Sequence, residues 1–129
     1  YLTYYKGSLF RVYYDTKSWE GAWEQCYNDH AHLAIPDSEK EANVIRSLYE
    51  DVPERDPETM FAYIGVHSLF KRNLWVTLDN KPVNKTGYYK WSPRHHSSTT
   101  DGRCAALHAL GGYLSIPCEE EHIFVCEME

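Results

Sequence analysis

The sequence of 129 residues predicts one α+β domain, residues 1–129, and three observations lead to this fold class. Two stretches in the first half carry apolar residues at helical spacing. The second half holds short runs of apolar, aromatic and β-branched residues, which are typical of strands. No linker, repeat or low-complexity tract divides the chain, and its length suffices for a single core.

Composition and charge argue against two classes of partner. The net charge of −6 and the pI near 5.6 disfavour nucleic-acid binding, which requires a basic face. No apolar run reaches the length of a membrane span. The chain starts at Tyr1 without a methionine, so we interpret it as a mature or trimmed form whose lack of a signal peptide says nothing about secretion.

The cysteines indicate the compartment. There are four, which allows three pairings, and the closest two, Cys118 and Cys126, have seven residues between them. Zinc-binding cysteines usually come in C-x-x-C pairs, so two disulfides in an oxidising compartment are favoured over a metal site. A glycosylation sequon begins at Asn84 and adds mild support for a secreted protein.

The first predicted elements are a strand over 9–14 and a helix that Ser18 caps. The helix would turn one apolar face to the core, formed by Trp19, Ala22, Trp23 and Cys26. We interpret both tryptophans as core residues without a ligand role.

A second strand and a second helix follow. The strand is expected over 32–35, ended by Pro36. The helix starts with a capping box in which Ser38 and Glu41 satisfy each other's backbone N–H groups. Its apolar face would comprise Ala42, Ile45, Leu48 and Tyr49. Residues 51–58 hold two prolines and five charges and predict a loop.

The remaining strands are expected over 61–66, 74–78, 88–91, 104–110, 113–116 and 122–128. The fourth of these follows a polar loop, and the Gly111-Gly112 pair predicts a hairpin turn after it.

Several of these residues carry a resemblance that extends over essentially the whole chain. A cysteine follows an S-W-x-x-A pattern at residues 18–26, and His32-Leu33-Ala34 starts a strand. The run 63–66, YIGV, stands where W-I-G-L is expected, and F-x-C-E closes the pattern at 124–127. In this order and spacing, the chain resembles a C-type lectin-like domain of the short form.

The resemblance implies two helices, two small antiparallel sheets, a long loop and two disulfides. It pairs Cys26 with Cys126 and Cys104 with Cys118. Closing these loops would stabilise the domain by about 4.7 and about 3 kcal/mol in a chain-entropy treatment. The runs 65–70, 75–77 and 86–91 further resemble arthropod haemolymph lectins, which bind microbial glycans in innate immunity, and the related lectins of parasitoid-wasp viruses, which are thought to blunt host immunity.

The resemblance also identifies where sugar-binding relatives hold Ca²⁺ through oxygen ligands. The E-P-N or Q-P-D triplet falls on His95, His96 and Ser97, or in another frame on Arg94, His95 and His96. The glutamate before the third-strand cysteine is Gly102 here. The W-N-D positions are held by Tyr113, Leu114 and Ser115. Asp101 is the single carboxylate of the loop, so we predict that the family's calcium site is lost and that the protein has no cofactor.

The long loop remains a candidate ligand surface, formed by Arg94, His95, His96, Ser97, Asp101 and Arg103. It could contact an anionic glycan, a microbial surface or another protein without calcium, or it could be a solvated loop that has lost its site. A zinc or nickel site on His95, His96 and Asp101 is disfavoured, because neighbouring residues rarely share a facing geometry. The same three residues are the only basis for an enzyme, a metal-dependent hydrolase, and no catalytic motif supports it. A homodimer formed through the long loop is the third alternative.

The remaining histidines and acids allow few further predictions. His30 and His32 would share a face if both lay in a strand, but no third metal ligand can be named. His67, His108 and His122 lie in or beside predicted strands, where structural histidines are usual. Residues 119–121, three glutamates, are interpreted as a solvated turn, with a cation or a basic partner as the alternative.

Overall fold

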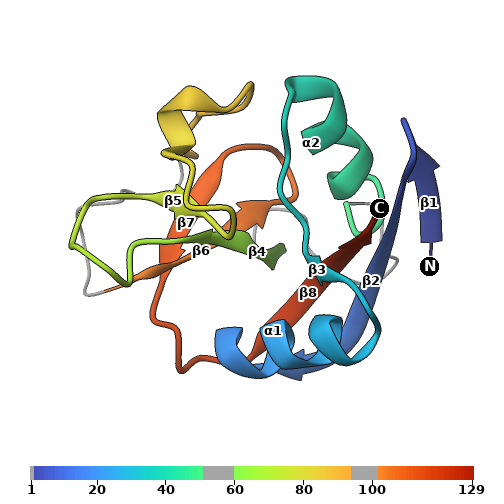
Figure 1. The fold of residues 1–129 in the computed structure, drawn as a ribbon, viewed down its shortest axis with the longest axis horizontal. Coiled ribbons are helices and arrows are strands. Elements are labelled where there is room, and N and C mark those ends of the chain that lie inside the picture. Colours follow the sequence, from blue (N-terminus) through green and yellow to red (C-terminus); the bar gives the residue numbers. More distant parts are fainter. Residues whose placement is uncertain (1, 51–59, 94–101) are drawn as a thin grey trace.

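A computed structural model describes residues 2–50, 60–93 and 102–129 of the chain (Figure 1). The predicted loop over 51–58 and residues 94–101 of the long loop lie outside the described residues. The chain begins with β1 (Leu2–Tyr5), β2 (Ser8–Lys17), α1 (Trp19–Asn28), β3 (His32–Leu33) and α2 (Glu39–Arg46). It continues with β4 (Phe61–His67), β5 (Val76–Thr77), the short 3₁₀ helix η2 (Val83–Lys85), β6 (Cys104–His108), β7 (Tyr113–Ile116) and β8 (His122–Met128).

The strands confirm the α+β class and are hydrogen-bonded in the order β1-β2-β8-β4-β6-β7. The short strands attach at two points, β3 to β8 and β5 to β4. The pairs are antiparallel except for β4 and β8, which run parallel and meet at Tyr63 and Phe124. This bridge joins the two expected groups of strands into one sheet, with α1 below and α2 above its centre in Figure 1. Both expected disulfides, Cys26–Cys126 and Cys104–Cys118, are present.

Helix α1 starts as predicted, since the Ser18 hydroxyl accepts a hydrogen bond of 3.2 Å from the Gly21 N–H. Its buried face holds Trp19, Ala22 and Cys26, but the predicted core position of Trp23 is wrong, because 40% of this residue is exposed. At about 100° per residue, position 23 lies roughly 70° from the centre of the buried face, at its edge. Trp23 therefore remains accessible from solvent.

Helix α2 departs from the predicted capping box in one bond. The Ser38 hydroxyl accepts from the Glu41 N–H at 3.0 Å, but the Glu41 carboxylate accepts from the N–H of Asp37 instead of that of Ser38, at 3.2 Å. The helix ends at Arg46, so Leu48 and Tyr49, which were predicted on its apolar face, lie in the turn that follows it. Both are nevertheless buried in the core.

Three strand predictions need correction. The strand expected over 32–35 is reduced to the two residues of β3. Residues 88–91 form no strand, and only Trp91 makes an isolated bridge, to Tyr113. The Thr86 hydroxyl instead bonds to the carbonyls of Val83 and Tyr88, which folds this segment locally. The strand expected over 74–78 is reduced to the two residues of β5. Strand β1, which no pattern predicted, pairs with β2 through a tight turn.

The hairpin between β6 and β7 turns at Gly111 and Gly112, as predicted. Both glycines have positive φ, +107° and +93°. A Cβ on Gly112 would lie 2.5 Å from the backbone of Ser92, so only glycine fits where the hairpin meets the segment that leads into the long loop.

Candidate recognition site

The two ends of the long loop are anchored to the sheet. On the entering side, the Ser92 N–H donates to the Tyr113 carbonyl at 3.0 Å. On the leaving side, the Ser68 N–H donates to the Arg103 carbonyl at 2.7 Å, and Cys104 is bonded to Cys118. The sheet thus presents the loop from β6, β7 and the end of β4.

Most of the predicted ligand loop lies outside the described residues, namely Arg94, His95, His96, Ser97 and Asp101. Of that set, Arg103 is described. Its side chain is half-buried and its Nη1 lies 3.5 Å from the Ser68 carbonyl oxygen, at the limit of a hydrogen bond. It is therefore held against the segment after β4 at the base of the loop.

The triplet positions of the family's calcium site lie outside the described residues, and the other four positions, 102 and 113–115, are buried. Tyr113 and Leu114 are 1% and 3% exposed in β7, and Ser115 is fully buried. Tyr113 packs edge-on against Tyr88 and Trp91, and its burial raises the pKa of the phenol. Gly102 is buried too, and a Cβ there would lie 2.8 Å from the Ile116 nitrogen. These positions contribute to packing.

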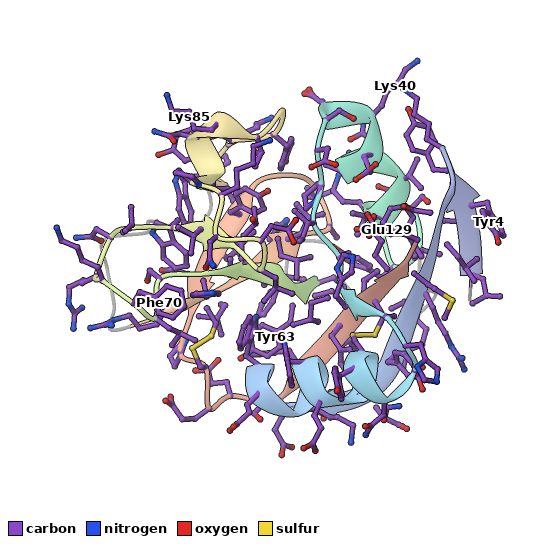
Figure 2. All side chains as sticks on the ribbon, in the orientation of Figure 1. Tyr4, Lys40, Tyr63, Phe70, Lys85 and Glu129 are labelled. Atoms are coloured by element: carbon purple, nitrogen blue, oxygen red, sulfur yellow. A yellow bond between two sulfur atoms is a disulfide. The ribbon has the colours of Figure 1, made fainter. Side chains whose placement is uncertain are left out.

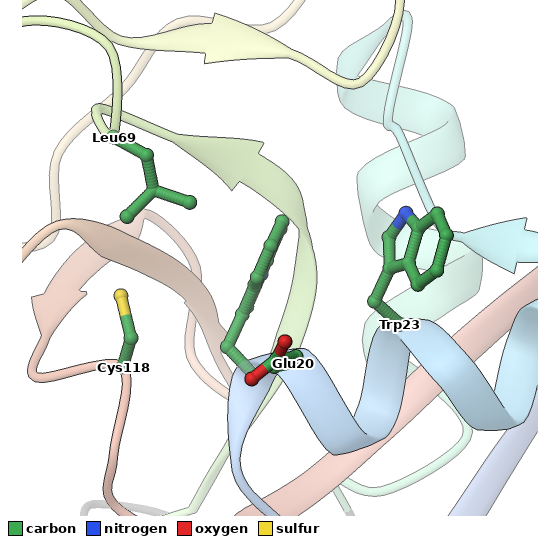
Figure 3. A pocket seen from close by; sticks show the side chains of 5 residues that line it. Glu20, Trp23, Leu69 and Cys118 are labelled. Atoms are coloured by element: carbon green, nitrogen blue, oxygen red, sulfur yellow. The ribbon is translucent and has the colours of Figure 1, made fainter.

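A pocket of about 360 Å³ opens beside the disulfide at the base of the loop (Figure 3). It lies between the first turns of α1 and the segment after β4, and its lining residues are Trp19, Glu20, Trp23, Leu69 and Cys118. In Figure 3 the Glu20 carboxylate and the Trp23 indole stand on α1, with Leu69 across the pocket from them. The pocket offers apolar and aromatic surface with one carboxylate at its edge.

Exposed aromatic residues continue from this pocket along α1. The rings of Trp23 and Tyr27 stack with centroids 5.4 Å apart and an interplanar angle of 6°, although Tyr27 is 65% exposed. Phe70, beyond Leu69, is 73% exposed. We name Trp23, Tyr27, Leu69 and Phe70 the aromatic patch. Such exposed apolar groups are typical of contact surfaces, and the helical spacing of Trp23 concealed the patch in the sequence.

His67 stands behind this surface at the end of β4. Its ring contacts Trp19 and Phe70 edge-on, at centroid distances of 5.5 and 5.1 Å. Burial lowers the pKa of His67, which favours the neutral imidazole at neutral pH. The Leu69 N–H donates to its Nδ1 at 3.1 Å, so His67 fixes the backbone of the segment that carries Leu69 and Phe70. This role is structural, as predicted for His67.

The other sequence-predicted residues lie apart from the pocket. Asn84 is exposed in η2, where its side chain is accessible. His122 lies 2.9 Å from the Glu120 carboxylate, and Glu119, Glu120 and Glu121 are exposed in a turn. His30 has a positive φ of 61° in the turn after α1, so His30 and His32 do not share one strand.

Comparisons with known proteins agree with this architecture. A family model described as the Lectin C-type domain matches residues 15–128. A hemolymph lipopolysaccharide-binding protein from Periplaneta americana is 31% identical over 124 residues, which cover 93% of this chain and 48% of that protein. The chain thus spans about half the length of this relative.

Snaclec A9 from Macrovipera lebetinus is 26% identical over 135 residues, covering 98% of this chain and 94% of the snaclec. Among solved structures, human lithostathine superposes with a TM-score of 0.83 at 23% identity, over 99% of this chain and 88% of that one. No helix in the described ranges is long and apolar enough to cross a bilayer.

Proposed function

Since the chain belongs to the C-type lectin domain family, we propose that it is a secreted recognition module of innate immunity or immune modulation that binds microbial-surface glycans without the family's principal calcium ion. Domains of this family are binding modules and not enzymes, so the hydrolase alternative falls away. The name of the Periplaneta americana relative supports lipopolysaccharide as the first ligand to test. Two disulfides and an accessible sequon at Asn84 support secretion.

The aromatic patch, together with the pocket beside the Cys104–Cys118 disulfide, is the observation that carries this proposal. The face of a sugar ring presents C–H groups, which pack on an indole, while its hydroxyls require hydrogen-bond partners. Trp23 offers the indole and Glu20 the acceptor, both at the rim of one pocket. Such a site needs no metal ion. The loop residues Arg94, His95 and His96 would add contacts to the phosphate or carboxylate groups of an anionic glycan.

The packing of the described calcium positions, 102 and 113–115, supports the calcium-independent part. Leu114 has no ligand oxygen in its side chain, and Gly102 has no side chain and no room for one. Ca²⁺ takes six to eight oxygen ligands, and a site without most of them does not hold it. We therefore propose that the protein has no calcium cofactor at this position.

A binding panel with and without EDTA tests the proposal. The protein is applied to bacterial cells, to immobilised lipopolysaccharide and to neutral glycans. We expect binding to one or more of the microbial surfaces that survives EDTA and falls at least fivefold in Trp23→Ala. Tyr4→Ala is the control, because Tyr4 is an exposed aromatic residue on β1 (Figure 2), outside the aromatic patch, and its loss should not change binding.

Two results would overturn the proposal. Binding that EDTA abolishes and Ca²⁺ restores would show that calcium holds the ligand. Equal binding by Trp23→Ala and wild type would remove the aromatic patch from the site. A His95→Ala/His96→Ala variant separates the loop from the patch, and size-exclusion chromatography with light scattering detects a dimer that would favour protein recognition instead.

A further inference from the structure

We propose that His32, Glu127 and Glu129 bind a divalent transition-metal ion such as Zn²⁺ where β3 meets the end of β8. This site is independent of the proposed glycan recognition. In Figure 2, Glu129 lies well apart from Phe70 of the aromatic patch. One potential ligand atom from each of the three residues lies within 4.8 Å of the other two.

Strand register creates this cluster. His32 pairs directly with Glu127 across the antiparallel β3–β8 ladder, so their side chains lie on the same face. Residues two apart in an extended chain also share a face, which brings Glu129 beside Glu127. The sequence supplied His32 as a candidate without further ligands, and the partner strand supplies two carboxylates.

The hydrogen bond of His32 occupies Nδ1 and leaves Nε2 available to bind a metal ion. Its Nδ1 lies 2.7 Å from the Leu33 carbonyl oxygen, which can only accept, so Nδ1 carries a proton. In the neutral ring, Nε2 then holds a lone pair, and this atom lies 3.5 Å from Oε1 of Glu129. A ring that donates from one nitrogen to a carbonyl and ligates through the other is the usual arrangement of metal-bound histidine.

Glu127 is positioned by the core. It is 4% exposed, and its two oxygens accept hydrogen bonds from the Ser8 hydroxyl at 2.8 Å and the Ile35 N–H at 3.1 Å. Each oxygen has a second lone pair that these bonds do not use. Burial raises the pKa of Glu127, and the charge of Glu129 adds to this rise. A divalent cation between the two carboxylates would offset the cost of burying the charge of Glu127 and the repulsion between Glu127 and Glu129.

The donor set selects the class of ion. Imidazole nitrogen suits Zn²⁺, Cu²⁺ or Ni²⁺, whereas Ca²⁺ prefers an all-oxygen shell. One histidine and two carboxylates provide three protein ligands and leave a position for water, as in open zinc sites. Ligands at zinc distances of about 2.0–2.2 Å must approach more closely than in the metal-free arrangement. Glu129, whose side chain is 72% exposed, is free to make that movement.

Isothermal titration of the untagged protein with ZnCl₂, together with visible spectra of the Co²⁺ form, tests the site. We expect one ion per chain and an affinity that falls at least tenfold in His32→Ala and also falls in Glu129→Gln. His30→Ala is the matched control, an exposed histidine two residues away, and should bind as wild type does. The His95→Ala/His96→Ala variant should also retain full affinity.

Unchanged zinc affinity in His32→Ala, or its loss in His95→Ala/His96→Ala, would overturn the proposal, as would Ca²⁺ binding more tightly than Zn²⁺ to these residues. If His32→Ala does not fold, ¹⁵N spectra of the histidine rings in the wild-type protein decide the question. Zinc should then shift Nε2 of His32 and leave its Nδ1 protonated. A shift confined to other histidines, or no shift, would refute the site.

Discussion

The indole N–H of Trp19 donates a buried hydrogen bond of 2.9 Å to the backbone carbonyl of Ile64, and thereby ties α1 to the central strand β4. The same ring contacts His67 and forms a wall of the pocket. The Trp19 side chain thus fixes α1, the helix that carries Trp23, against β4 and the pocket.

Because of this bond, substitutions of Trp19 and Trp23 should affect the stability of the protein to different degrees. Trp19→Phe removes the donor from a buried carbonyl and leaves a small void, so the free energy of unfolding should fall by about 1–3 kcal/mol. Trp23→Phe, at an exposed position, should change it by less than about 0.5 kcal/mol. Urea unfolding followed by circular dichroism measures both, and equal losses would contradict the assigned burial.

Restoring the family's glutamate at position 102 should not restore calcium binding. Gly102→Glu places a Cβ 2.8 Å from the Ile116 nitrogen, which forces the strand end apart. We expect a loss of about 1–3 kcal/mol, typical of overpacking, and no heat on titration with Ca²⁺. Arg103→Gln, at the half-buried neighbouring position, changes the net charge by the same −1 and is the control for charge. Calcium binding by Gly102→Glu without loss of thermal stability would refute this prediction.

The two disulfides should differ in their contribution to stability. The Cys104–Cys118 bond spans 14 residues and the Cys26–Cys126 bond spans 100. Replacing the first pair with alanine should cost about 3 kcal/mol, and replacing the second about 4.7 kcal/mol. Denaturant titration of the two double variants gives the order, and a reversed order would show that strain or residual structure outweighs loop closure.

Stability should decrease as pH rises from about 4.5 to about 7. Burial raises the pKa of Glu41 from 4.5 to about 7, helped by the nearby charges of Glu127 and Asp37. Between these values the folded chain keeps a proton that the unfolded chain releases, so rising pH favours unfolding. Glu41→Gln retains an oxygen that can accept from the Asp37 N–H and removes the charge.

The variant should therefore match the wild type near pH 4.5 and exceed it above pH 7, as measured by thermal unfolding across this range. Glu24→Gln, on the exposed face of α1, controls for the loss of one negative charge. An advantage of Glu41→Gln that is the same at all pH values would exclude titration of Glu41 as its cause.

Periodicity and motif order predicted the helices, the central strands and both disulfides because these features depend on local spacing and on a pattern that spans the chain. Residues 88–91 have strand composition, yet the tertiary contacts of Tyr88 and Tyr113 replace a ladder. Strand β1 depends on a turn with positive φ at Lys6 and Gly7, which its composition did not reveal.

The candidate site was less predictable for a related reason. The sequence drew attention to the long loop, where ligands of the family are expected, and interpreted Trp23 as core. The exposure of Trp23 depends on where β4 and the segment after it meet α1, and no single segment of the sequence specifies that contact. The carboxylate partners of His32 likewise come from a strand that lies about 95 residues away in the chain, so only the register of β3 on β8 reveals them.

The Cys26–Cys126 bond also determines how the domain would respond to a mechanical load. Force applied to the two ends of the chain would reach this covalent bond after extending only the residues outside it, which form β1, β2, most of α1 and the last residues of β8. The segment from Cys26 to Cys126, with a sequence separation of 100 and roughly 350 Å of contour length, would stay within a closed ring. Under such a load, α1 would unfold and its side of the pocket would be lost. Strands β4, β6 and β7, which lie inside the ring, would bear no tension.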